Sequence, residues 1–296
     1  MTSKTIAIIQ LVSTMLMVAL VTVLAKKTLA DIQAIDFIWL QMVFACVSIC
    51  IYSFWIKREK ITANIPLAAW AIILAIGISN FTIVRTLFIL ALEVMPVTTH
   101  AYLINFVGIM TMILSAIFLR ERPGFWQVVG ALVAIAGIQI YFRVIPDNQL
   151  IYGLVLIALA VFFLALTNIL MRLLHLKYPN FLSHNVVSSV AVVSGGLPLI
   201  LYGLQYWERA LTISFNHWIV IAANGVIAMS LTMNVFNLVL KVLRAYQASI
   251  LASSGLVFTA MFAIPILDES LNLFQLGGIA LLLLGIAMVQ CFRNAQ

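Results

Sequence analysis

Leu119-Arg-Glu-Arg-Pro-Gly-Phe-Trp-Gln-Val-Val-Gly130 is the stretch that decides the fold, because it returns 148 positions later as Leu267-Asp-Glu-Ser-Leu-Asn-Leu-Phe-Gln-Leu-Gly-Gly278. The two copies share a leucine, a glutamate, a glutamine and a glycine at the same spacing, and an aromatic residue precedes the glutamine in both. The offset of 148 is half of the 296-residue chain. The sequence therefore predicts one module written twice, with a first repeat over 1–148 and a second over 149–296.

The composition indicates that the solvent of this chain is lipid. The chain is 65% hydrophobic and 8% charged, with a mean hydropathy of +1.17. A soluble domain is roughly half apolar and about a quarter charged. The excess of basic residues lies in short loops between apolar runs, which is an orientation signal and not a nucleic-acid surface. We therefore expect an all-α, multi-pass protein with membrane lipid around it and no nucleic-acid partner.

Long apolar runs in lipid are read as helices, because every backbone amide must bond inside its own segment. About 20 residues are needed to cross the hydrocarbon core. The sequence predicts ten transmembrane helices: 6–25, 34–56, 67–91, 96–119, 124–142, 150–172, 182–204, 217–239, 245–266 and 273–292.

The basic residues predict the direction of these spans. With the N-terminus inside, the inner loops and ends hold 11 of the 16 Lys and Arg residues, and the outer half holds Lys26, Lys27, Arg85, Arg143 and Arg209. The positive-inside rule then places both termini in the cytoplasm. Because each repeat has five spans, an odd number, the second repeat is expected to be inverted with respect to the first.

The motif Leu-x-Glu-x5-Gln-x2-Gly-x6-Gly-Ile closes each half, over 119–138 and 267–286. Ten helices in two inverted five-helix repeats with this motif resemble the drug/metabolite transporter (DMT) superfamily, and specifically its EamA-type members. The resemblance implies a secondary transporter of the bacterial inner membrane that works by alternating access. The family often has a proline in the middle of the fourth and ninth spans, whereas this chain has Gly108 and Gly255 nearby, so a helix break there stays open.

Arg85 is the basic residue that lies well inside an apolar run. It could bind a substrate carboxylate or phosphate through paired N–H donors. It could also extend to the outer headgroups or pair with Glu93. All nine Asp and Glu residues lie at or near span ends. A pump for lipophilic cations normally needs a buried carboxylate, so this pattern favours a zwitterionic or anionic substrate.

Other polar residues inside the spans are candidate substrate contacts, because polar groups in lipid are costly and are often functional. Their alternative role is an interhelical hydrogen bond. His100 could also couple transport to protons, since histidine titrates near neutral pH. The candidate substrate-binding residues are Arg85, Asn80, His100, Tyr102, Asn105, Asn224, Ser253 and Ser254.

Residues near the span ends suggest a rim and a brace. His184 and Asn185 are candidate gate or rim residues, and Trp39 is read as an interface anchor or, alternatively, as a wall of the outer vestibule. Glu121 and Glu269 are expected to cap or brace the N-terminus of the helix that follows each of them. Small residues on the fifth and tenth spans predict close helix packing, either as a scaffold or as a homodimer contact.

The function expected from the sequence is secondary active transport of a small metabolite, such as an amino acid or another zwitterionic or anionic compound, across the cytoplasmic membrane. A multidrug exporter and a flippase of a lipid-linked group remain alternatives. A membrane-embedded enzyme is the remote alternative, because no catalytic constellation and no zinc-ligand spacing is found. No Gly-x4-Gly-Lys-Ser/Thr loop occurs, and we expect neither a cofactor nor a metal.

Overall fold

The computed structural model describes residues 3–60, 65–120, 123–142, 148–178, 183–239, 242 and 251–291, and these are helical with short connections. In the first repeat the helices are α1 (Ser3–Thr28), α2 (Ala34–Cys50) with the π-helix η1 (Ile51–Ile56), α3 (Leu67–Gly77), the π-helix η2 (Ile78–Val84), α4 (Arg85–Val94), α5 (Val97–Ile104), α6 (Val107–Phe118) and α7 (Phe125–Tyr141). In the second they are α8 (Asn148–Lys177), α9 (His184–Gly203), the short η3 (Leu204–Tyr206), α10 (Trp207–Thr212), α11 (Phe215–Ala223), the π-helix η4 (Asn224–Leu231), α12 (Thr232–Val239), α14 (Ser254–Leu267) and α15 (Leu273–Cys291).

Within the described residues, seven continuous helical stretches are long and apolar enough to cross a membrane. Three shorter apolar helices, Phe125–Tyr141, Ser254–Leu267 and Leu273–Val289, lie where the fifth, ninth and tenth spans are expected. Part of the ninth, at 245–250, lies outside the described residues. An all-helical protein with multiple apolar helices is thus confirmed, while ten crossings and the orientation of the termini stay predictions.

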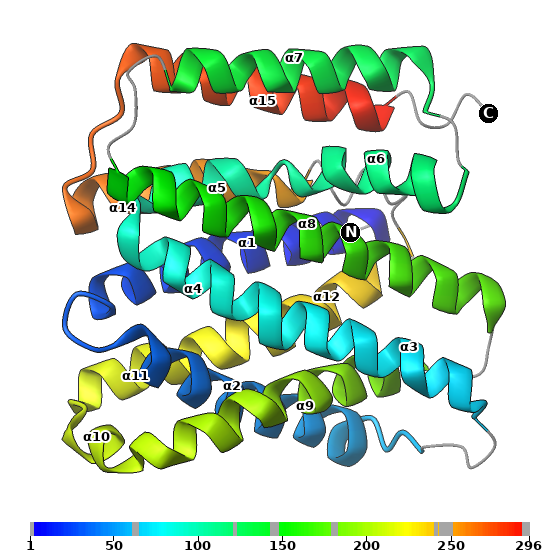
Figure 1. The fold of residues 1–296 in the computed structure, drawn as a ribbon, viewed down its shortest axis with the longest axis vertical. Coiled ribbons are helices and arrows are strands. Elements are labelled where there is room, and N and C mark those ends of the chain that lie inside the picture. Colours follow the sequence, from blue (N-terminus) through cyan, green and yellow to red (C-terminus); the bar gives the residue numbers. More distant parts are fainter. Residues whose placement is uncertain are drawn as a thin grey trace.

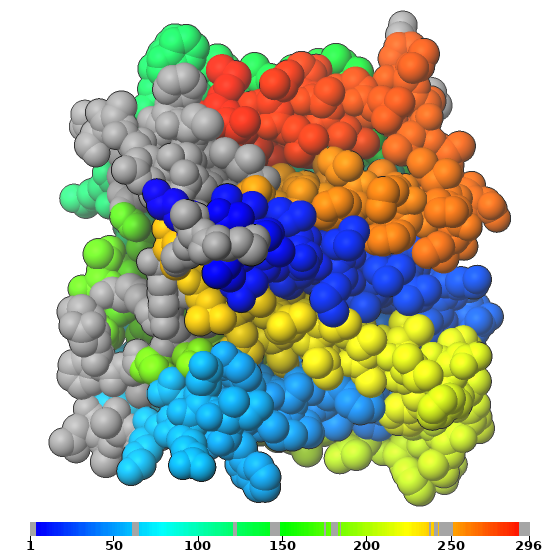
Figure 2. Space-filling view, turned by 180° about the vertical axis from the view of Figure 1, so that it is seen from behind, coloured from blue at the N-terminus to red at the C-terminus, as the bar shows by residue number. Residues whose placement is uncertain are grey.

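The two repeats are interleaved rather than separated into two lobes. The helices lie side by side across the long axis of the molecule, with α7 and α15 at one end and α2, α9, α10 and α11 at the other (Figure 1). From behind, α1 lies between α14 and the α11–α12 stretch, so a helix of the first repeat packs between two of the second (Figure 2). The largest apolar core lies among α2, α3 and α9, where Phe37, Met42 and Ile73 are fully buried.

The helices α7 and α15, which are equivalent in the repeat, pack antiparallel against each other through glycines. A Cβ atom on Gly130 would lie 2.7 Å from the carbonyl oxygen of Gly285, and one on Gly137 would lie 2.9 Å from that of Gly278. Adding 148 to Gly130 gives Gly278, and subtracting 148 from Gly285 gives Gly137. The repeat therefore converts the first of these contacts into the second. The predicted close packing of these small residues is therefore confirmed, and each glycine face is covered within the chain.

The same backbone features recur at equivalent positions of the two halves. Arg120 and Asp268 are left-handed, with φ of 55° and 54°. Asn105 and Ser253 share φ and ψ of −64° and −15°, and −63° and −15°. The π-helices η2 and η4 also overlap when the chain is shifted by 148 residues. These matches are local structure that a duplicated sequence would produce.

The helix break left open in the fourth span is present, but it lies at Asn105 and Phe106, before Gly108. The chain turns at Asn105 and Phe106, whose amides donate to the carbonyls of Tyr102 and Leu103, at 3.3 and 3.1 Å, instead of continuing the α-helical pattern. The Asn105 side chain donates from Nδ2 to the Ala101 carbonyl at 2.8 Å and so satisfies an acceptor at the turn. The asparagine thus takes the place of the missing backbone donor.

Glu269 caps a helix, but not the one expected. Its two carboxylate oxygens accept from the backbone N–H groups of Val97 and Thr98, at 2.6 and 3.2 Å, at the N-terminus of α5. The helix that follows it, α15, is capped by Asn272, which accepts from the amide of Gln275. A carboxylate is stabilised at the free N–H groups of the first turn of any helix that reaches it. The prediction that Glu269 caps a helix is therefore confirmed, but the helix is α5 and not α15. Glu121 lies outside the described residues.

Candidate binding cavity

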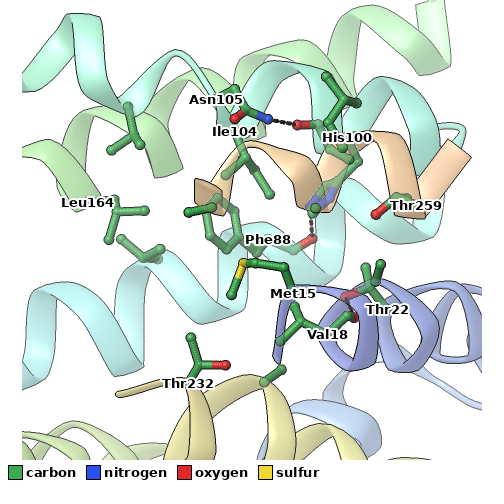
Figure 3. A pocket seen from close by; sticks show the side chains of 18 of the residues that line it. Met15, Val18, Thr22, Phe88, His100, Ile104, Asn105, Leu164, Thr232 and Thr259 are labelled. Atoms are coloured by element: carbon green, nitrogen blue, oxygen red, sulfur yellow. Dashed lines mark hydrogen bonds between the residues drawn. The ribbon is translucent and has the colours of Figure 1, made fainter. Parts of the chain in front are cut away.

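A cavity of about 530 Å³ lies among α1, η2, α4, α5, α6, α8, η4, α12, α14 and α15. Figure 3 shows its wall, with Met15, Val18 and Thr22 of α1 facing Phe88, His100 and Asn105. The wall is mostly apolar, and none of the described residues that line it is an aspartate or glutamate. Its polar side chains are Thr22, Asn80, Arg85, His100, Asn105, Asn224, Thr232, Ser253 and Thr259.

Arg85, the first residue of α4, is held at this cavity by two neutral amides. Its Nε donates to Oε1 of Gln41 at 3.1 Å, and its Nη2 donates both to that oxygen and to Oδ1 of Asn224. Gln41 comes from α2 and is fully buried. Neither suggested alternative for Arg85 holds, because its side chain neither pairs with Glu93 nor extends to the headgroups.

These hydrogen bonds occupy two of the three nitrogens of the Arg85 guanidinium and do not neutralise its charge. Within the described residues no carboxylate forms an ion pair with it, and no hydrogen bond from Nη1 is found. A buried cation without a counter-charge is costly in a low-dielectric surrounding. An anionic group in the cavity would offset that cost and would meet Nη1, since Nε and Nη2 are already occupied.

His100 lies on the wall of the cavity on α5 and is 4% exposed. Its Nε2 is 3.1 Å from the carbonyl oxygen of Phe88, and the two rings meet edge to face at 5.6 Å. Because a carbonyl oxygen can only accept, Nε2 carries the proton. Nδ1 is buried and has no hydrogen-bond partner in the described residues, which fits a neutral ring.

Asn105 and Ser253 approach the cavity at the two equivalent breaks, and Asn80 and Asn224 approach it from the two π-helices. Interruptions of helices and π-helical segments occur often at functional sites, because they redirect side chains and free backbone groups. The cavity therefore brings together six of the eight predicted substrate-binding residues: Asn80, Arg85, His100, Asn105, Asn224 and Ser253. Their role in binding stays a prediction.

Two predicted substrate contacts lie away from the cavity. Tyr102 is fully buried and stacks on Tyr141 of α7, with ring centroids 4.2 Å apart. Its orientation follows from helix geometry, because residues 100 and 102 of α5 point to different faces. The Ser254 hydroxyl donates to the carbonyl of Leu251 at 2.6 Å and stabilises the break locally.

Two of the predicted rim residues, Trp39 and Asn185, contact neighbouring segments of the chain. Trp39 is 6% exposed, and its ring packs on Gly203 of α9, where any side chain would overlap it. This corrects the expectation of an interface anchor or vestibule wall. Asn185 donates to Oε1 of Glu59 at 2.9 Å, which joins the start of α9 to the segment after η1. The side chain of His184 lies outside the described residues.

Gln41, which holds Arg85, was not among the residues predicted from the sequence. The sequence signal was present, because Gln41 interrupts an apolar run of the second span just as Arg85 interrupts the third. A glutamine in lipid needs a partner as an arginine does. Thr22, Thr232 and Thr259 were also missed, since hydroxyls that can bond to their own helix give a weak signal.

Comparisons with known proteins agree with this architecture. The model of the EamA-like transporter family matches twice, over residues 5–143 and 151–291. No curated protein matches the chain. One solved structure, titled only "Crystal structure of protein", aligns with a TM-score of 0.68 over 96% of this chain and 97% of its own, at 14% identity, which shows a shared fold alone. The two family matches span nearly the whole chain, and the protein therefore belongs to the EamA-like transporter family, within the DMT superfamily of membrane transporters.

Proposed function

We propose that the protein is a secondary active transporter that moves a small anionic or zwitterionic metabolite, such as an amino acid, across the cytoplasmic membrane. The observation that carries this proposal is Arg85, which lies at a cavity with no Asp or Glu among its described lining residues and is held by the neutral amides of Gln41 and Asn224. Arginine binds carboxylate and phosphate oxygens well, because its N–H groups are directed and its charge is permanent. A lipophilic cation would be repelled by the same wall.

The size and lining of the cavity suit a small metabolite. A volume of about 530 Å³ falls within the range of pockets that enclose small molecules. The apolar part of the wall, with Met15, Phe88 and Leu164, would contact the carbon skeleton of the substrate. The amides of Asn80 and Asn105 add polar groups to the same wall.

The mechanism that we infer is alternating access between two inverted halves. The ten predicted spans would place both termini in the cytoplasm, and the five-span repeats would then face in opposite directions. The cavity is lined by equivalent breaks from both halves, at Asn105 and Ser253. Exchange of conformation between the halves would open the cavity to one side and then to the other.

Counterflow in proteoliposomes tests the proposal. The purified protein is assayed with a panel of amino acids and simple carboxylates against lipophilic cations, with and without a proton gradient. We expect exchange of an anion or zwitterion that is lost in Arg85→Ala and reduced in Asn105→Ala. Exchange of cations alone, or exchange of anions that Arg85→Ala leaves intact, would contradict it.

A further inference from the structure

The contact between Gln41 and Arg85 leaves one group unsatisfied. Oε1 of Gln41 accepts from both Nε and Nη2 of Arg85, whereas Nε2 of Gln41 is buried and has no hydrogen-bond partner among the described residues. The amide cannot be turned around, because Nε2 would then face the guanidinium donor against donor. The glutamine therefore orients Arg85 while one of its own polar groups stays unpaired, which costs free energy.

A glutamate at position 41 would remove that cost. A carboxylate of the same length can accept two parallel N–H bonds from an arginine, and it has no N–H of its own to leave unpaired. It would also neutralise the guanidinium, and a paired buried charge is more stable than an unpaired one. Considered for stability alone, glutamine is thus the poorer partner for Arg85.

The second hydrogen-bond partner of Arg85, Asn224, is also an uncharged amide. Asn224, from the π-helix η4 of the other repeat, accepts from Nη2 through Oδ1 and is 2% exposed. Its Nδ2 donates to the carbonyl of Val21 at 3.4 Å, which fixes the direction of this amide as well. Two buried amides therefore position the guanidinium from two sides without taking up its charge.

We propose that Gln41 is a positioning residue that holds Arg85 for the anionic group of the substrate and, because it is an amide and not a carboxylate, keeps the charge of Arg85 available. This inference rests on the proposed function and deepens it. The substrate anion takes the place that an internal carboxylate would otherwise fill. Its contact is made at Nη1, the nitrogen that Gln41 and Asn224 leave free.

Substitution of Gln41 by glutamate tests whether transport depends on the free charge of Arg85, because it adds a counter-charge but keeps an oxygen that accepts from Arg85. In the counterflow assay, with the carboxylate that wild-type protein exchanges fastest, we expect Gln41→Glu to raise the apparent KM at least about tenfold, with little change in maximal rate, because a ground-state interaction is lost. The midpoint of thermal unfolding in detergent should equal or exceed that of wild type. Gln41→Leu, which removes the acceptor, should lose transport and also unfold at a lower temperature.

A second glutamine gives the matched control. Gln127 lies at the start of α7 and accepts from the amide of Gly124 at 2.8 Å, away from the cavity. A glutamate there keeps the accepting oxygen, so Gln127→Glu should retain both the KM and the unfolding midpoint of wild type. If it raised KM as much as Gln41→Glu does, an added carboxylate anywhere would suffice and the inference would be wrong.

The outcomes distinguish this inference from the proposed function. Absence of anion exchange in wild type, or full exchange in Arg85→Ala, would overturn the proposed function itself. If those two behave as expected and Gln41→Glu transports with the wild-type KM, only the role of Gln41 falls. A Gln41→Glu protein that unfolds as early as Gln41→Leu would also overturn the inference, because its loss of transport would then come from the fold.

Discussion

At the scale of single residues, the chemistry of the site depends on the neighbours of Arg85, which are neutral amides and, among the described residues, include no paired carboxylate. The sequence indicated an arginine in an apolar run and carboxylates only at span ends, and both features point to an anion. It did not indicate the neighbours of Arg85, because Gln41 and Asn224 lie 44 positions before it and 139 after it. Contacts between helices so distant along the chain follow from packing and cannot be read from periodicity.

Replacement of Arg85 by lysine tests whether substrate binding needs the directed hydrogen bonds of the guanidinium as well as its positive charge. Lysine keeps the positive charge, but its single ammonium group cannot bond to Gln41 and Asn224 along a planar edge while it presents another nitrogen to the cavity. We expect Arg85→Lys to lower kcat/KM for the anionic substrate by about 10- to 100-fold, which corresponds to about 1.4–2.8 kcal/mol. Counterflow at several substrate concentrations measures this. A lysine variant equal to wild type would show that charge alone is sufficient.

At the scale of helices, the repeat predicted which elements are equivalent but not how each is interrupted. The proline common in the family is absent, and the break in the fourth span instead lies at Asn105, whose side chain caps Ala101. The π-helix η2 begins directly after Gly77, the π-helix η4 includes Gly225, and these two glycines pack closely on α9 and α2. Such interruptions depend on neighbouring helices, so a hydrophobic run of the right length cannot reveal them.

The cap on α5 predicts a measurable loss of stability. Glu269→Ala removes two hydrogen bonds to the N–H groups of Val97 and Thr98 and should destabilise the protein by about 1–2 kcal/mol. Glu269→Gln, which keeps one accepting oxygen, should lie between. The control is Asp268→Asn, which also removes one negative charge and tolerates the left-handed φ of 54°. Thermal unfolding in detergent compares the three, and equal midpoints for Glu269→Ala and Asp268→Asn would refute the cap.

At the scale of the whole molecule, internal symmetry explains why α7 and α15 form a layer of their own at one end (Figure 1). The contact of Gly130 with Gly285 and that of Gly137 with Gly278 are related by the 148-residue repeat, so each helix presents the same face to the other. Antiparallel packing of equivalent helices is the arrangement that inverted halves require. The glycine faces predicted from the sequence are covered within one chain. A homodimer contact, which stays a prediction, would therefore have to use the outer apolar faces of this pair.

The orientation of the two halves can be measured at a matched pair of positions. Phe125 and Leu273 are equivalent in the repeat, begin α7 and α15, and are 74% and 84% exposed. In a background with Cys46, Cys50 and Cys291 replaced, we expect an impermeant maleimide added to intact cells to label Leu273→Cys. Phe125→Cys should be labelled only after the membrane is opened, because the positive-inside rule places the Arg120 loop in the cytoplasm. Labelling of both from the same side would mean that an even number of crossings separates them, and the inverted arrangement would then be wrong.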